Sequence, residues 1–305
     1  MTRAVVIWQW TDGKRGHERQ CEGLLAALKR RIAVEHYLLP VAPSSLQRGF
    51  AFVAGTLPAW RDLPNPDLII GAGRRCAWPL LTARRARGGH TVCIMRPQLP
   101  RCWFDLCVVP RHDDLPPSAN VIVTEGPLNP MRPAATREAG LGVILLGGPS
   151  AHHDWHDETM LAQIAQLRAS TPDMRWVVTD SRRSPPTLAA RLVAMPDLEF
   201  MDYRNAPGTW LPDLLARASQ AWVSADSVSM IYEALSAGAH VGVLAVPARR
   251  ADRISAISDD LHARGHIMFL AEAGRDTASS PLLLQEAERV AGLILTRWPA
   301  LGCPA

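Results

Sequence analysis

Short runs of apolar residues alternate with longer stretches of helical periodicity along most of the chain. Apolar runs of strand length followed by amphipathic helices are typical of βαβ units, which form parallel sheets. A Pro- and Ala-rich stretch at Pro130–Arg137 interrupts the alternation and predicts a linker. Before it, the pattern predicts strands at Ala4–Trp8, Ala33–Leu38, Asp67–Gly71, Thr91–Met95, Leu106–Val109 and Val121–Thr124, and helices at Glu18–Arg31 and Arg74–Arg87.

The alternation resumes after this stretch. Because single cores seldom grow past roughly 250–300 residues, we expect an α/β protein with two Rossmann-like domains, residues 1–134 and 135–305, whose last helix can cross back to the first domain. Asp154 and Asp157 predict a capping box. The second half predicts strands at Leu141–Leu146, Arg175–Thr179, Glu199–Met201, Ala221–Ser224, His240–Leu244 and Ile267–Leu270, and helices at Asp154–Ala169, Pro186–Ala194, Trp210–Ala218, Val228–Ala237, Ala251–Ala263 and Leu282–Thr296.

The composition favours a cytoplasmic globular protein. Hydrophobic residues make up 48% of the chain and charged residues 20%, and no apolar run reaches the roughly 18–20 residues that a transmembrane helix needs. The first strand leads directly into polar Thr11–Lys14, without the apolar stretch of a signal peptide. The six cysteines include no CxxC pair, which favours reduced thiols over zinc or disulfide frameworks.

Arginine dominates the positive charge and points to anionic partners. The net charge is +4, and Lys14 and Lys29 are the lysines. The planar guanidinium group suits phosphate binding, and arginines are dense within Arg74–Arg87. Only five Phe and three Tyr occur, with no zinc-finger or RNP motif, so we expect no nucleic-acid partner.

The loop after the first predicted strand carries the first candidate chemistry. Ligands of parallel sheets bind beyond the carboxyl ends of the strands. His17 is a candidate general base, and Asp12 lies close to it in sequence. Lys14, Gly16 and Gln20 complete the polar loop, where a helix N-terminus could receive an anion. An ordinary Asp-Gly turn before an exposed first helical turn is the alternative.

Two further strand ends in the first half are candidate binding loops. Gly71, Gly73 and Arg74 predict a tight turn with an arginine that could meet a phosphate or carboxylate; a glycine turn before a solvated basic helix is the alternative. His112 and Asp113 follow a strand and could do acid/base work, unless they form an Asx-type turn.

Three strand ends of the second half predict a diphosphate site. Because they follow strands of one sheet, their backbone N–H groups, hydroxyls and arginines should converge. Glu233 could bind a ribose diol, or it could be an ordinary first-turn helix carboxylate. His152 and His156 have the spacing of a helical zinc pair but lack a third ligand, so a solvated helix start is favoured. The candidate donor-site residues are Gly147, Gly148, Ser150, Ser181, Arg182, Arg183, Asp226, Ser227, Ser229, Met230 and Glu233.

These loops also form an ordered series that resembles a known family. They are Asp12-Gly13-Lys14 with Gly16-His17 and Gln20, Gly71-Ala72-Gly73-Arg74-Arg75, Gln98 with Pro100-Arg101 and Phe104-Asp105, His112-Asp113, Asn120-Val121, Thr124, Gly126-Pro127-Leu128-Asn129, Gly147-Gly148-Pro149, Ser181-Arg182-Arg183, and Asp226-Ser227-Val228-Ser229-Met230 followed by Glu233-Ala234. The series resembles the mitochondrial-fission family named for elongated mitochondria in plants, whose bacterial members are regarded as glycosyltransferases.

The resemblance implies a GT-B-like fold, in which two Rossmann-like domains face each other across a cleft. It implies a nucleotide-diphosphate sugar in the C-terminal domain, with Glu233 as the ribose-binding acid. We expect transfer of the sugar to an unknown glycan or lipid-linked acceptor, with no obligatory metal or cofactor. His17, or Asp12 with it, would accept the hydroxyl proton, and Arg182 or Arg183 would neutralise the leaving group.

Two other functions agree with the same residues. A sugar-nucleotide epimerase shares the expected architecture. The plant member of the family resembles an adaptor that recruits a dynamin-like GTPase, so a non-catalytic scaffold is the other alternative. The basic Arg74–Arg87 stretch would suit either a scaffold or an enzyme peripheral to the inner face of the membrane.

Overall fold

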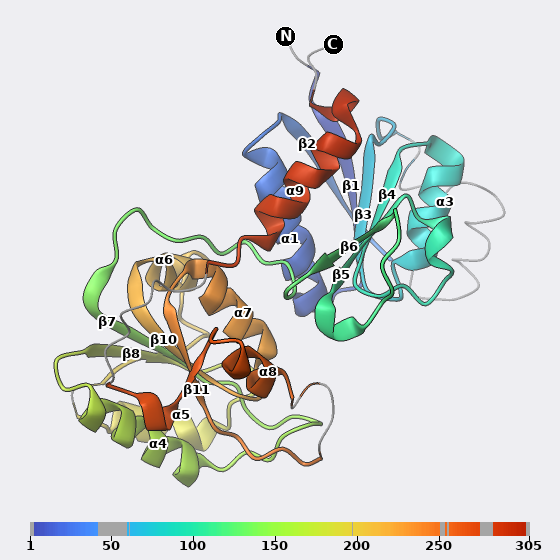
Figure 1. Cartoon of the computed structure of the whole chain (residues 1–305). Coiled ribbons are helices and arrows are strands. Elements are labelled where there is room, and N and C mark those ends of the chain that lie inside the picture. The colour runs from blue at the N-terminus through green and yellow to red at the C-terminus, as the bar shows by residue number, and fades with distance from the viewer. Residues whose placement is uncertain are drawn as a thin grey trace. The chain divides into compact units, whose positions relative to one another are not determined.

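The computed structural model describes residues 3–41, 60, 62–196, 198–250, 254, 256–274 and 283–302. The chain divides into two compact units. Unit 1 comprises Met1–Pro130 together with Gln285–Ala305, and unit 2 comprises Met131–Leu284. The chain therefore leaves unit 1 and later returns to it, so that the last helix (red in Figure 1) belongs to the first unit.

Unit 1 contains one six-stranded sheet in the order β2-β1-β3-β4-β5-β6. All neighbouring strands are parallel. The strands are β1 (Val5–Thr11), β2 (Val34–Pro40), β3 (Leu68–Ala72), β4 (His90–Ile94), β5 (Leu106–Pro110) and β6 (Val121–Thr124). The helices are α1 (Arg15–Lys29), α3 (Ala77–Arg87) and α9 (Glu286–Arg297), with short 3-10 helices η2 (Arg101–Trp103), η3 (Arg111–Asp113) and η5 (Pro299–Leu301).

Alternating side chains of β1 divide the core of unit 1 into two layers. Ile7 packs on the face covered by α1 and α9, whereas Trp8 packs on the opposite face, with α3. α9 lies along α1 (Figure 1), where Arg30 pairs with Glu288 at 2.6 Å. Both faces of the sheet are covered, which explains why its central strands β3 and β5 are nearly continuous apolar runs.

Unit 2 contains a second parallel six-stranded sheet, in the order β12-β11-β10-β7-β8-β9. Its strands are β7 (Glu138–Leu145), β8 (Arg175–Thr179), β9 (Glu199–Met201), β10 (Ala218–Ser224), β11 (His240–Leu244) and β12 (Met268–Phe269). Its helices are α4 (Asp157–Ser170), α5 (Pro186–Val193), α6 (Trp210–Arg217), α7 (Val228–Ala237) and α8 (Ile257–Ala263), followed by the 3-10 helix η4 (Leu270–Glu272).

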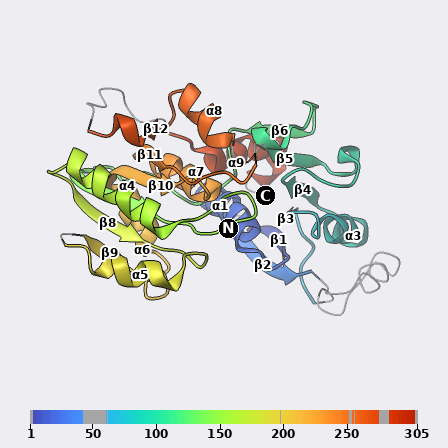
Figure 2. The ribbon, with the colours of Figure 1, turned by 90° about the horizontal axis from the view of Figure 1, so that it is seen from below.

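The helices of unit 2 also cover both faces of its sheet. Residues of α4 and α5 pack into one core cluster, and residues of α6, α7 and α8 pack into the other. These helices can be followed in Figure 2. The predicted α/β class with two Rossmann-like sheets is confirmed.

Several helix starts differ from the prediction. α3 begins at Ala77 rather than Arg74, because Gly73, with φ of +80°, opens a turn that contains the two arginines. The predicted capping box is wrong: α4 begins at Asp157 without a side-chain cap, and Asp154 instead pairs with Arg249 at 2.8 Å. α8 and α9 also begin later than predicted, although 251–253, 255 and 282 lie outside the described residues. Within the described part of the chain, no helix combines the length and apolarity required for a membrane span.

Candidate functional site

The strand order of unit 2 marks where a ligand could bind. From β7 the chain builds outward through β8 and β9 on one side of the sheet, and then returns to place β10 on the other side of β7. The loops after β7 and β10 therefore leave the sheet in opposite directions. In open α/β sheets, this switch point leaves a crevice beyond the carboxyl ends of the strands.

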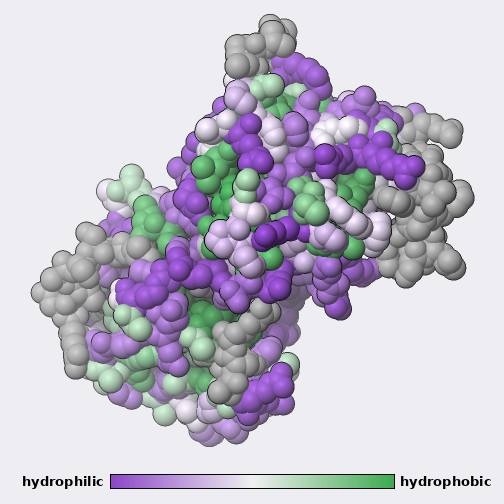
Figure 3. All heavy atoms as spheres, turned by 45° about the vertical axis from the view of Figure 1, so that its right-hand side comes forward, coloured by the Kyte–Doolittle hydropathy of each residue, from purple (hydrophilic) through white to green (hydrophobic). Residues whose placement is uncertain are grey.

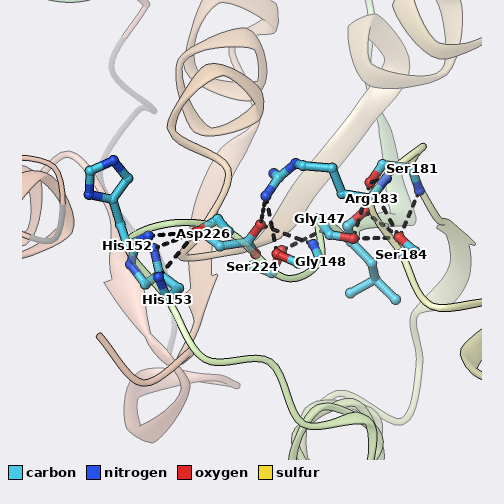
Figure 4. A network of polar contacts seen from close by, with 11 residues as sticks. Gly147, Gly148, His152, His153, Ser181, Arg183, Ser184, Ser224 and Asp226 are labelled. Carbon is cyan, nitrogen blue, oxygen red and sulfur yellow. Dashed lines mark hydrogen bonds and ion pairs between the residues drawn. The ribbon is translucent and has the colours of Figure 1, made fainter. Parts of the chain in front are cut away.

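Two glycines bring the β7 and β10 loops into direct contact (Figure 4). The Gly147 N–H donates to Ser224 Oγ at 2.8 Å, and the Gly148 N–H donates to Asp226 Oδ2 at 3.0 Å. A Cβ at Gly147 would collide with the Asp226 carboxylate, and a Cβ at Gly148 would collide with the Arg183 carbonyl group. Glycine is therefore required at both positions for this close approach.

The loop after β8 joins the same network. Ser181 Oγ donates to the Gly147 carbonyl oxygen at 3.0 Å, and Ser184 Oγ donates to that oxygen as well. Arg183 Nη1 donates to the Gly148 carbonyl oxygen at 3.1 Å and lies 2.7 Å from Asp226 Oδ2. Hydrogen bonds thus hold three strand ends together.

Asp226 is the buried charge of this network. Its side chain is 0% exposed, whereas the Arg183 side chain is 39% exposed. Its Oδ1 atom is buried and has no hydrogen-bond partner among the described residues. An uncompensated buried carboxylate would be strongly destabilising, so Arg183 both neutralises Asp226 and is held by it at the edge of the crevice.

The N-terminus of α7 lies directly after Asp226. Ser227 is the N-cap residue and makes no side-chain cap hydrogen bond. The first N–H groups of a helix have no partner within it and carry the positive end of the helix dipole, which favours an anion. Ser229 is exposed and Met230 half-buried. Glu233 is buried and lies beyond the first turn, so its interpretation as a first-turn carboxylate is wrong.

Ser150 and Arg182 border the network differently. Ser150 Oγ accepts hydrogen bonds from the N–H groups of His152 and His153, at 3.2 and 3.1 Å, and so shapes the loop after β7. Arg182 is exposed. Sequence reasoning missed Ser184. Ser184 stands just before the Pro185-Pro186 start of α5, a position that could have signalled a loop-stabilising role.

Unit 1 has its own switch point, between β1 and β3. Here His17 Nδ1 lies 3.1 Å from both carboxylate oxygens of Asp12. The Asp12 side chain is 1% exposed and the His17 side chain 20% exposed. The Lys14 N–H also donates to Asp12 Oδ1, at 3.2 Å. A Cβ at Gly73 would collide with the imidazole ring, so this glycine makes room for it.

The Asp12–His17 dyad has the geometry of an oriented general base. A carboxylate that accepts the Nδ1–H fixes the tautomer of the ring and stabilises the imidazolium that forms when Nε2 takes a proton. Nε2 is the ring nitrogen that Asp12 does not engage. The dyad could therefore deprotonate a hydroxyl group beyond the β1 strand end.

The other predicted residues of unit 1 are distributed more widely. Gln20 is buried, and its Nε2 donates to the Gly16 carbonyl oxygen at 3.5 Å. Gly71 packs against Cys76, while Arg74 is exposed in the turn before α3. His112 and Asp113 lie in η3, after β5. Three strand spacings separate β1 from β5, which is about 14 Å, so the fold does not bring this pair to the dyad.

Among the residues that the structure describes, no group of three or more His, Cys, Asp and Glu side chains could hold a metal ion. The His152 and His156 pair gains no third ligand within these ranges.

Comparisons with known proteins place this geometry in context. A family model described as Mitochondrial fission ELM1 matches residues 15–298. The uncharacterized protein RP120 of Rickettsia prowazekii is 24% identical over 291 residues, which cover 76% of this chain and 81% of that protein.

Two solved structures show the same fold. One is a Listeria monocytogenes protein described as a UDP-N-acetylglucosamine 2-epimerase, with a TM-score of 0.57, 11% identity and 98% of each chain covered. The other is the spinosyn forosaminyltransferase SpnP, with a TM-score of 0.51 and 14% identity over 98% of this chain and 92% of that chain. The two parallel sheets therefore form a GT-B fold.

Proposed function

Because the chain belongs to the mitochondrial fission ELM1 family and has a GT-B fold, we propose that it is a glycosyltransferase that uses a nucleotide-diphosphate sugar. The observation that carries the proposal is the switch-point crevice of unit 2. There, two glycine N–H groups, the start of α7 and a positioned arginine meet beyond the strand ends.

Unit 2 binds the donor in this proposal. The N-terminal N–H groups of α7 and the guanidinium groups of Arg182 and Arg183 receive the diphosphate, since both kinds of donor bind phosphate oxygens well. Asp226 is a positioning residue, because its buried carboxylate holds Arg183 at 2.7 Å. Glu233 binds the ribose diol. Its burial means that only a nucleoside seated deep in the crevice reaches it.

Unit 1 binds the acceptor and supplies the base. His17 Nε2 accepts the proton of the acceptor hydroxyl as its oxygen attacks the anomeric carbon, and Asp12 stabilises the imidazolium. The bond from the anomeric carbon to the diphosphate oxygen breaks at the same time. Arg182, Arg183 and the α7 N–H groups offset the charge that develops on the diphosphate. The reaction needs no obligatory metal or cofactor, and the acceptor is a glycan or a lipid-linked acceptor.

Two alternatives share the fold. A sugar-nucleotide epimerase would convert the donor without an acceptor, so product analysis separates it from a transferase. A non-catalytic adaptor would not need the Asp12–His17 dyad, in which the Asp12 side chain is buried. Burying a carboxylate beside a histidine costs free energy of folding. A catalytic role for the pair would explain why this cost is tolerated, which favours an enzyme.

A nucleotide screen tests the donor site. Thermal unfolding is measured with UDP, GDP, dTDP and ADP and with their sugars. A ligand at 100 times its dissociation constant adds about 2.7 kcal/mol to the free energy of unfolding. Gly148→Ala should abolish the shift, because the Cβ collides with the Arg183 carbonyl group. Gly208→Ala is the matched control, since a Cβ there meets nothing within 4 Å.

Two outcomes would contradict the donor proposal. One is the absence of a shift with every nucleotide. The other is a shift that Gly148→Ala leaves intact while circular dichroism shows both variants folded.

A further inference from the structure

Two tryptophans lie exposed side by side on unit 1. Trp78 on α3 is 41% exposed, and Trp103 on η2 is 46% exposed. Their ring centroids are 6.3 Å apart with the planes at 61°. An open groove of about 520 Å³ runs between the two elements, lined by Trp78, Leu81, Arg84, Arg85, Cys102 and Trp103. We call this surface the Trp–Arg face.

The fold holds the Trp–Arg face in place. Ala77, Leu80 and Ala83 turn one side of α3 into the core, so helical periodicity directs Trp78 and Arg85 outward. Arg84 Nη1 donates to the Trp103 carbonyl oxygen at 3.1 Å, and Arg84 Nη2 lies 3.0 Å from Asp105 Oδ1. These contacts fix η2 against α3, so the two indoles are presented on a preformed surface.

The sequence that supplies the Trp–Arg face is rich in arginine. The sequence from Leu68 to Phe104 contains no aspartate or glutamate. The nearest following acid, Asp105, is already paired with Arg84. Arg87 turns inward, where it contacts the Trp8 ring and the Trp60 carbonyl oxygen. The exposed arginines of this region are Arg74, Arg75, Arg84, Arg85 and Arg96.

We propose that the Trp–Arg face docks unit 1 on the surface of an anionic phospholipid membrane. Tryptophan has an apolar body and a polar N–H group, which suit the headgroup layer of a bilayer. Arginine binds phosphate oxygens and is attracted by the negative surface potential of anionic lipid. Figure 3 shows apolar (green) and hydrophilic (purple) residues side by side on the surface of unit 1.

A membrane fits this face better than a protein partner does. Protein interfaces pair apolar cores with rims of mixed charge. The sequence from Leu68 to Phe104 supplies arginines and no acid, which suits a negatively charged lipid surface. The inference stands apart from the proposed sugar transfer. It concerns where the chain docks, and it holds for an enzyme or an adaptor.

Vesicle co-sedimentation tests the docking. The full chain is mixed with vesicles of phosphatidylcholine alone, or of phosphatidylcholine with phosphatidylglycerol, at low and high salt. We expect binding to the anionic vesicles and its loss at about 1 M salt, where the screening length falls to about 3 Å. Trp78→Ser with Trp103→Ser should lower the partition coefficient about tenfold per tryptophan. Arg85→Gln should lower it about fivefold.

Matched controls come from unit 2. Tyr203→Ser removes an aromatic side chain that is 37% exposed, and Arg191→Gln removes one positive charge. Both should retain wild-type binding. Binding to neither vesicle type, equal binding to both, or anionic binding unaffected by the tryptophan double variant would each overturn the proposal. If the serine variants unfold, the double variant Trp78→Phe with Trp103→Phe replaces them. Brominated lipid should quench the tryptophan fluorescence of this variant less than that of the wild type. Undiminished quenching would also overturn the proposal.

Discussion

Replacing Asp12 with asparagine tests the central chemical step of the proposal. Asparagine keeps the shape of the side chain. It also keeps an oxygen that can accept the hydrogen bond that the Lys14 N–H donates to Asp12 at 3.2 Å. It removes the negative charge that lies 3.1 Å from His17 Nδ1. The substitution therefore isolates the electrostatic contribution of the carboxylate from its structural contribution.

The size of the effect follows from the geometry. Two unit charges about 4 Å apart interact by about 4 kcal/mol at an effective dielectric constant of 20. The Asp12 side chain is 1% exposed, so solvent screens it little. If the imidazolium forms in the transition state, removing the Asp12 charge raises the activation free energy by about this amount. Since 1.36 kcal/mol corresponds to a factor of ten in rate, the reaction should slow about a thousandfold.

The assay measures release of nucleoside diphosphate from the donor that the thermal screen identifies. The turnover number should fall in Asp12→Asn, while the donor-induced thermal shift should persist because the proposed donor site lies in unit 2. Glu22→Gln is the matched control. It also removes one negative charge from the β1–α1 region, but Glu22 pairs with Arg15 rather than His17. Turnover within about threefold of wild type in both Asp12→Asn and His17→Ala would refute the assignment of the base.

Three further predictions concern stability. In urea unfolding, Gly73→Ala should lower the free energy of unfolding of unit 1 by at least about 1 kcal/mol more than Gly13→Ala does. Both glycines have positive φ, but only the Cβ at Gly73 meets the His17 ring. Equal losses of unfolding free energy in the two variants would contradict this. Arg183→Gln should lower the free energy of unfolding by about 2 kcal/mol, because it leaves Asp226 buried without its cation. Adding Asp226→Asn should restore most of this free energy. No restoration would argue against a stabilising ion pair. Burial raises the pKa of Asp180 above 3.8, so ionising it weakens the fold as pH rises through that folded pKa. Asp180→Asn should therefore raise the free energy of unfolding of unit 2 at pH 7, and this gain should disappear below about pH 3.8. A destabilisation of equal size at both pH values would contradict the argument.

The sequence predicts the strands closely because most of them are apolar runs between polar loops. Val121–Thr124, Arg175–Thr179 and His240–Leu244 are strands with the predicted bounds. Helix starts were harder to predict, since they depend on contacts that a local pattern does not contain. Asp154 reads as a cap three residues before Asp157, yet in the fold it pairs with Arg249, far away along the chain.

The candidate sites show a similar division. Strand-end reasoning selects the loops that carry Asp12, His17, Gly147 and Asp226. It does not reveal that β1 neighbours β3, or that β7 neighbours β10, and these pairings bring Gly73 under His17 and Asp226 against Gly148. Isolated serines such as Ser184 carry no periodic signal. Their role becomes visible only when the carbonyl groups that they meet are in place.

The return of the chain to unit 1 has a consequence for how the protein is made. Ala287, Val290, Ala291 and Ile294 of α9 belong to the same core cluster as Leu24 and Leu28 of α1. A ribosome synthesises these α9 residues only after it has completed all of unit 2. Unit 2 can therefore fold during translation as a contiguous segment, while the core cluster that α1 shares with α9 stays incomplete in the nascent N-terminal segment. Chaperones that bind exposed apolar surface should accordingly associate with the N-terminal segment until synthesis is nearly complete.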